Sequence, residues 1–348
     1  MIFKSDNCGP ALPEVMDAVV AANEGFQSSY GKDEMMEEVR DLIRTEFEAP
    51  EAAVYLVSTG TAANALALST LAQPWDTIFC TPLAHIQVDE CHAPEFYTGG
   101  GKLSLVGTND KMTAEALDAA ITGWTKDDVH TSQRGPVALT QVTERGRVYS
   151  LDALKALTGV AKAHGLTTHM DGARFANAMI ALGCSAAEMT WKAGIDAVSF
   201  GGTKNGCLGV EAVIFFDPAH AWEFELRRKR GAHLFSKHRY LSAQMQGYLR
   251  GDVWKRAAKV TNAKTARMIA GLRDASEFEF MFEPAANMIF ATLPRRVHRA
   301  LWQAGARYEL HGALDGPDEE RLGMRLVVGW SVEEADIDRF VEIASGTL

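Results

Sequence analysis

Three short stretches of the chain combine chemically active side chains with glycines and other small residues. They are "STGTAAN" at residues 58–64, "HMDGAR" at 169–174 and "GGTKNG" at 201–206. Each follows an apolar run that is typical of a buried strand. Ligands of open α/β sheets bind beyond the carboxyl ends of the strands, so the three stretches are candidate parts of a binding site.

The first stretch could bind a phosphate. It lies where a predicted strand gives way to a helix, and small residues let backbone N–H groups approach an anion at a helix N-terminus. We expect Gly60 and Thr61 to cradle that anion. Taken alone, the same pattern could be an ordinary Ser/Thr cap of a helix.

The second stretch places Asp171 at the end of a strand, directly before Gly172. A carboxylate there could bind a metal, cap a helix or pair with a cationic ring nitrogen. Arg174 could hold a carboxylate through two parallel hydrogen bonds. An internal ion pair between Asp171 and Arg174 is the simpler alternative.

The third stretch sets one lysine, Lys204, among small residues. A lysine taken out of water has a lowered pKa and becomes a nucleophile that can condense with an aldehyde. Gly201, Gly202 and Gly206 would let the backbone come close to such a partner. The alternative is a turn lysine that reaches solvent.

The joint pattern is more specific than its parts. Pyridoxal 5'-phosphate needs N–H donors for its phosphate, an acid for its pyridine nitrogen and an amine for its aldehyde. The three stretches provide these groups in order along the chain. We therefore predict pyridoxal 5'-phosphate as the cofactor.

The elements that must position these residues alternate between strand and helix from about residue 50 to 216. Apolar runs such as "AAVYLVST" and "DAVSFGG" predict strands, and amphipathic segments such as "SLDALKALTGVAKAHG" predict helices. The alternation predicts an α/β fold in which helices cover both faces of a mostly parallel sheet.

Beyond "FFDPAH" the pattern changes to helices over about 221–231 and 236–272, followed by short strands and two further helices. This order predicts a small α+β C-terminal domain. We expect an N-terminal arm over residues 1–15 that reaches the active site, a large cofactor-binding domain over 16–250 and the small domain over 251–348.

Composition limits the possible partners. The net charge of -10 argues against a general nucleic-acid or anionic-membrane surface. We expect no signal peptide and no membrane span. The five cysteines are widely spaced and form no CxxC pair, which fits a reducing cytoplasm and points to no metal site.

Further stretches extend the pattern along the chain: "SDN" near the start, "YG" at 30, "AHIQVDECHAPE", "TQVTERGRVYS", "HMDGARFANA", "WKAGIDAVSFGGTKNG", "SKHRYLSAQ" and "MRLVVGW". With them the chain resembles the fold-type I threonine aldolase family, within the wider aromatic β-eliminating lyase group. It looks most like the bacterial low-specificity members, and the resemblance is weakest from about 255 to 320.

The resemblance implies roles around the cofactor. Lys204 would hold it covalently, Asp171 would pair with its ring nitrogen, and Gly60 and Thr61 would bind its phosphate. The other residues implied to border the cofactor are His85, which stacks on the ring, Arg174, and Arg239, which reaches across from a neighbouring subunit.

The resemblance also implies roles around the substrate. Ser5, Arg174 and Arg325 would hold its carboxylate, and Tyr30 would enter the site from the partner subunit. Glu90 lies five residues after His85 and would line the same pocket. His85, directly or through water, and Glu90 are both candidates for the base that takes the hydroxyl proton.

One residue departs from the family pattern. Some members have a histidine, near the substrate hydroxyl, where this chain has Glu144. A glutamate there could accept a proton or bind ordered water, so the identity of the base stays open.

The resemblance implies reversible retro-aldol cleavage of L-threonine or L-allo-threonine to glycine and acetaldehyde in a cytoplasmic homodimer or homotetramer with shared sites. One alternative keeps the cofactor but acts on phenylserine or eliminates or transaminates another amino acid. A different alternative is a nucleotide-binding α/β module without catalysis, although the chain has no GxxxxGK[ST] or GxGxxG at a strand end.

Overall fold

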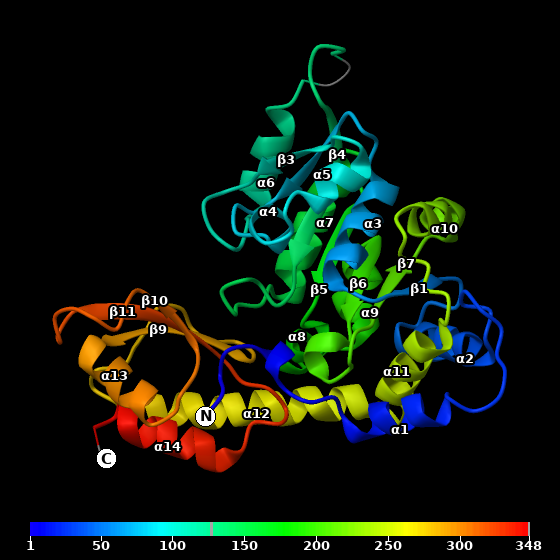
Figure 1. Ribbon diagram of the computed structural model, residues 1–348. Helices are drawn as coiled ribbons and strands as arrows, with labels where there is room; N and C mark the ends of the chain where they lie inside the picture. The colour runs from blue at the N-terminus through cyan, green and yellow to red at the C-terminus, as the bar shows by residue number, and fades with distance from the viewer. Residues whose placement is uncertain (126–127, 347–348) are drawn as a thin grey trace.

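The computed structural model describes residues 1–125 and 128–346. These residues form a larger α/β domain and a smaller α+β domain, and helix α12 (Val253–Arg273) runs along both of them (Figure 1). Among the helices of the described residues, none combines the length and the apolar character that crossing a membrane requires.

The large domain is built on a seven-stranded sheet in the order β1-β7-β6-β5-β4-β2-β3. Strands β2 to β6 run parallel to one another, which confirms the predicted fold class. The strands are β1 (Ala53–Val57), β2 (Asp76–Cys80), β3 (Lys102–Leu105), β4 (Gln133–Thr140), β5 (Thr168–Gly172), β6 (Ala197–Gly201) and β7 (Glu211–Phe215).

Strand β7 is antiparallel to both of its neighbours, β6 and β1. The sequence predicts β7 as a strand but not its direction. The connection from β6 to β7 holds only the short 3₁₀ turn η3 (Thr203–Asn205). A parallel return needs a crossover of a dozen or more residues, so this short connection must reverse the chain.

Both faces of the sheet are buried, as expected for strands that read as continuous apolar runs. In β1, Val54 and Leu56 join the main core, whereas Tyr55 and Val57 face a second cluster under α3 (Gly60–Leu71). The other helices of this domain are α1 (Pro13–Ala21), α2 (Glu34–Glu46), α4 (His85–Val88), α5 (Ala93–Thr98), α6 (Ala114–Thr122), α7 (Leu151–Ala163), α8 (Phe175–Leu182), α9 (Ala186–Met189), α10 (Ala221–Arg230) and α11 (Arg239–Leu249).

The helical region predicted over 236–272 is divided into α11 and α12. Gly251 and Asp252 between them have positive φ angles of 61° and 56°. The left-handed conformation cannot continue a right-handed helix. The chain therefore changes direction at this point, and α12 leaves the large domain.

The small domain carries a four-stranded antiparallel sheet in the order β10-β11-β9-β8. Its elements are β8 (Glu279–Phe280), β9 (Met288–Pro294), α13 (Arg295–Gln303), β10 (Glu309–His311), β11 (Arg321–Val327) and α14 (Glu334–Ala344).

Two segments join the cores of the two domains. The first turns of α12 bury Trp254 in the main core, and its last turns bury Met268 in the core of the small domain. The N-terminal segment does the same, with Phe3 in the small core and Leu12 in the main one. The residues between them are thereby fixed at the junction of the domains.

Candidate functional site

The site is built where β5 and β6 end side by side. Asp171 of β5 pairs in register with Ser199 of β6, and the turn that carries Lys204 follows β6 directly. A Cβ on Gly172 would lie 2.7 Å from the carbonyl oxygen of Ser199, and one on Gly201 would lie 2.5 Å from that of Ala173. Only glycine allows the two strand ends to approach this closely.

Lys204 is partly buried. Burial lowers the pKa of its amine, and the positive charge of Arg174 lowers it further. The carboxylates of Asp6, Asp171 and Glu211 oppose this shift. The side chain has the character of a nucleophilic lysine, since a lowered pKa leaves more of the amine unprotonated.

Asp171 is held by donors on both oxygens. The N–H of Ala173 donates to its Oδ1 over 2.9 Å, and the amide of Asn64 donates to its Oδ2 over 2.8 Å. Sequence reasoning did not select Asn64, although it belongs to the "STGTAAN" stretch. Asn64 lies one turn into α3, where its side chain points back to the strand ends.

Asn64 also links Asp171 to a second pair of groups. Its amide donates to Glu90 Oε1 over 2.9 Å, and the same oxygen lies 2.8 Å from His85 Nδ1. The hydrogen bond to Glu90 raises the pKa of His85, and burial raises the pKa of Glu90. The structure thus brings His85 and Glu90 together.

Glu144 lies beside this pair. Its Oε1 accepts hydrogen bonds from the backbone N–H of His85 over 2.9 Å and from the Thr140 hydroxyl over 2.8 Å. Its Oε2 is buried and has no hydrogen-bond partner in the described part of the chain. Burial raises the pKa of Glu144 to about 7.

Arg174 does not pair with Asp171, the simpler alternative, but with Asp6 of the N-terminal segment. Its Nε and Nη2 donate to the two Asp6 oxygens, each over 2.8 Å, and the amide of Asn287 donates to the same carboxylate over 3.1 Å. The charge and hydrogen bonds of Arg174 outweigh burial and lower the pKa of Asp6. Sequence reasoning missed Asp6, although it stands in "SDN" beside Ser5.

Ser5 is predicted to hold a substrate carboxylate. In the structure its hydroxyl accepts a hydrogen bond from the N–H of Asn7 over 3.2 Å. The short 3₁₀ turn that it caps packs against the turn that carries Lys204. Ser5 therefore lies near the lysine, and its predicted role stays a prediction.

The N-terminus of α3 fits the phosphate of the predicted cofactor. Thr59 caps the helix by accepting a hydrogen bond from the N–H of Ala62. A Cβ built on Gly60 would meet no atom within 4 Å, so there is open space beside the first turn. First-turn N–H groups have no partner inside the helix, which leaves those of Gly60 and Thr61 able to bind an anion. Asp171 and Lys204 likewise match the ring nitrogen and the aldehyde.

Three predicted residues have other partners within this single chain. Arg325 pairs with Glu309 at 2.6 Å. Arg239 donates to the carbonyl oxygens of Glu24 and Gly25. Tyr30 is 43 % exposed, and the Lys229 ammonium lies 5.2 Å from its ring centre. Their predicted roles at the site stay predictions.

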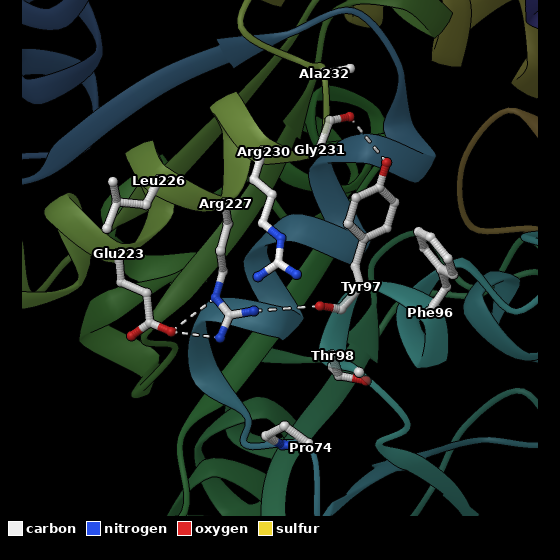
Figure 2. A pocket seen from close by; sticks show the side chains of 11 residues that line it. Pro74, Phe96, Tyr97, Thr98, Glu223, Leu226, Arg227, Arg230, Gly231 and Ala232 are labelled. Carbon is white, nitrogen blue, oxygen red and sulfur yellow. Dashed lines mark hydrogen bonds and ion pairs between the residues drawn. The ribbon is translucent and has the colours of Figure 1, made fainter.

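A cavity of about 840 Å³ lies elsewhere, between α5 and α10 (Figure 2). Tyr97 and Arg227 form its walls, and it extends to Pro74, beyond the C-terminal end of α3. None of the predicted site residues, all of which the structure describes, lines this cavity. The chemistry gathered around Lys204 is therefore at a different place.

Comparisons with known proteins agree with this geometry. The β-eliminating lyase family model matches residues 3–294. A low specificity L-threonine aldolase of Pseudomonas aeruginosa is 40% identical over 98% of this chain and 95% of its own length. One from a Pseudomonas species is 38% identical, over 96% and 94%. A structure of Leishmania major threonine aldolase superposes with a TM-score of 0.91, 25% identity and 99% coverage of both chains.

Proposed function

Because the chain belongs to the β-eliminating lyase family and is similar to its low-specificity L-threonine aldolases over nearly its full length, we propose that it cleaves L-threonine and L-allo-threonine to glycine and acetaldehyde. The enzyme is a pyridoxal 5'-phosphate-dependent lyase, and the cleavage is reversible. The proposal is carried by one observation. Lys204, Asp171 and the N-terminus of α3 lie together at the carboxyl ends of the parallel strands.

The bound cofactor supplies an electron sink for the pair released when a bond at the substrate Cα breaks. Lys204 would provide the amine that holds the cofactor through its aldehyde. Asp171, oriented by Asn64 and by the N–H of Ala173, provides the negative charge that keeps the ring nitrogen protonated. Gly60 and Thr61 hold the phosphate.

Arg174 orients the substrate carboxylate. Asp6 occupies its Nε and Nη2 edge, so Nη1 is the donor left for the substrate. Arg325 is the second predicted donor. To bind the substrate carboxylate it has to leave Glu309 or bind both carboxylates at once. By fixing the carboxylate, these arginines would hold the Cα–Cβ bond in the orientation that cleavage needs.

His85 takes the proton from the β-hydroxyl. Glu90 binds Nδ1 of its ring, which leaves Nε2 as the nitrogen available to the substrate. The raised pKa of His85 makes the imidazolium stable once the proton has moved. Glu90 then acts chiefly by orienting His85, and Glu144 fixes the backbone of the same residue.

We also propose a cytoplasmic homodimer or homotetramer with shared sites. Tyr30 lies in the loop before α2, and Arg239 opens α11 directly after a second loop. The two loops are tied together, since the N–H of Tyr30 donates to the carbonyl of Ser236. In the same loops the side chain of Phe26 is fully exposed and that of Phe235 is 48 % exposed. Exposed aromatic side chains of this kind, close to Tyr30 and Arg239, are what a subunit contact would use.

The test compares the purified protein with two lysine variants. The unmodified protein should show a visible absorbance band that shifts with glycine, and it should release acetaldehyde and glycine from L-threonine. Lys204→Ala should lose both the band shift and turnover while remaining folded. Lys192→Ala, which removes a lysine paired with Glu48 on the surface, should behave as the unmodified protein does.

Each other outcome identifies a different function. A band without acetaldehyde, but with benzaldehyde from phenylserine, would assign the enzyme to phenylserine cleavage. A keto acid and ammonia would indicate elimination, and a keto acid without ammonia would indicate transamination. A protein that stays colourless in pyridoxal 5'-phosphate would contradict the cofactor assignment and favour a nucleotide-binding module.

A further inference from the structure

One buried carboxylate beside the lysine has no part in the reaction described so far. Glu211 opens β7, directly opposite Gly201 at the end of β6. Glu211 is only 7 % exposed, although β7 lies next to the edge strand of the sheet. A buried carboxylate is costly unless it is paired or hydrogen-bonded, so its presence here calls for a function.

The contacts of Glu211 converge on the turn that carries Lys204. Its Oε2 accepts a hydrogen bond of 2.8 Å from the N–H of Gly202, and its carboxylate also accepts one from the Thr203 hydroxyl. Gly202 and Thr203 are the two residues before Lys204. The carboxylate is therefore fixed to the same short segment as the amine.

We propose that Glu211 is a positioning residue for Lys204. Its carboxylate ties the lysine-bearing turn to β7 and supplies a negative charge that favours the protonated form of the Lys204 nitrogen. This inference rests on Lys204 being the cofactor lysine of the proposed function.

The charges around the two groups set the sign of the effect. Burial raises the pKa of Glu211 to about 7, and the charge of Lys204 opposes that rise. Glu211 in turn raises the pKa of Lys204 against burial and Arg174. The groups that face Lys204 are Arg174, Asp6, Asp171 and His85. Those that face Glu211 are Asp171, Cys207 and Tyr248.

The carboxylate and the amine thus influence each other's titration. Below about pH 7 Glu211 holds its own proton and exerts little pull on Lys204. Above that pH it becomes an anion and holds a proton on the lysine nitrogen. The effect of removing its charge should accordingly grow as the pH rises above 7.

Glu211→Gln separates the charge from the hydrogen bonds. The amide oxygen can still accept from Gly202, and the amide nitrogen can donate to the Thr203 hydroxyl. Glu211→Leu removes both the charge and the bonds. Thr203→Val is the control that keeps the carboxylate. It loses the hydroxyl's bond to Glu211 and the hydrogen bonds of that hydroxyl with the backbone of Val210.

The first measurement is a pH titration of the visible absorbance of the full-length holoenzyme. In Glu211→Gln the absorbance change should shift to lower pH than in the unmodified protein, whereas Thr203→Val should titrate nearly as the unmodified protein does. A purely structural role would leave the midpoint in place. An unchanged midpoint in Glu211→Gln would overturn the electrostatic part of the proposal.

The second measurement does not need catalysis. The full chain, before cofactor is added, is treated with an amine-acetylating reagent over a pH series, and modification of Lys204 is quantified by peptide mass spectrometry. Lys204 should react faster in Glu211→Gln than in the unmodified protein above pH 7 and equally fast below it. Equal rates throughout would contradict the proposal.

Further readouts keep the proposal testable if a variant does not fold. In the unmodified protein, the rate of Lys204 acetylation should rise with pH over a wider range than the titration of a single proton would give. A rate that follows a one-proton titration would overturn the coupling. Glu211→Leu should unfold at a lower temperature than Glu211→Gln, and equal unfolding would overturn the tie to β7. Borohydride fixation of the cofactor on another peptide would instead overturn the lysine assignment of the proposed function.

Discussion

At the scale of single residues, Glu144 links the site to the stability of the protein. Its pKa rises from an ordinary value of 4.5 to about 7 in the folded chain because the carboxyl is buried. Below pH 4.5 both states hold the proton. Between 4.5 and 7 the unfolded chain loses it first, so the free energy of unfolding falls as the pH rises through this window.

Glu144→Gln cannot titrate and should lack this decline. Measured by denaturant unfolding of the cofactor-free chain, the stability of the variant relative to the unmodified protein should rise by about 2 to 3 kcal/mol between pH 5 and 8. The exposed Glu51 offers a matched control, and Glu51→Gln should show no such trend. If the difference in stability between Glu144→Gln and the unmodified protein did not change with pH, the carboxyl of Glu144 would already be ionised at pH 5.

The sequence locates some site residues better than others. Lys204 and Asp171 could be predicted because each stands directly after an apolar strand and beside glycine. Asn64 and Asp6 could not, because their roles come from partners more than 100 residues away along the chain. The pairing of Arg325 with Glu309 likewise depends on the register of β10 and β11.

At the scale of elements, the close approach of β5 and β6 is the feature that sets Lys204 beside Asp171. Gly201→Ala would place a Cβ 2.5 Å from the carbonyl oxygen of Ala173, and that backbone can move little. Overpacking of this kind costs about 1 to 3 kcal/mol. We expect denaturant unfolding to show that loss, together with weaker binding of pyridoxal 5'-phosphate.

Gly209→Ala is the control for this prediction. Its Cβ would lie 3.5 Å from the nearest atom, the carbonyl oxygen of Ser58, which is an ordinary contact. It should therefore change stability and cofactor binding little. If the two glycine variants behaved alike, the strand ends would not need to lie so close.

The elements themselves follow the sequence pattern closely, and the exceptions have local causes. Helical periodicity continues from α11 into α12, so the pattern does not reveal that Gly251 and Asp252 adopt left-handed backbone. The direction of β7 follows from the short connection before it, which the spacing of the two apolar runs already shows.

At the scale of the whole molecule, the proposal of shared sites can be tested by mixing two inactive chains. In a hybrid dimer of Lys204→Ala and Arg239→Ala chains, one site would carry both defects and the other neither. Random exchange of subunits should therefore restore about a quarter of the unmodified activity if Arg239 acts across the interface. Acetaldehyde release from L-threonine is the measurement.

The separate variants, taken through the same exchange, are the controls and should stay at their own low activities. Activity in the mixture no higher than the average of the two would mean that Arg239 serves its own chain. Sedimentation of each variant would show whether subunits still associate, which distinguishes a lost contact from a lost site.

The position of β1 has a consequence for the order in which the chain can fold. β1 ends the sheet, and within the described residues its one strand partner is β7, with Val57 opposite Glu211. During synthesis β1 therefore emerges roughly 150 residues before the strand that completes it. Until then its apolar residues form an open edge that invites pairing with other chains. The nascent protein is thus most exposed to aggregation just before the lysine-bearing hairpin leaves the ribosome.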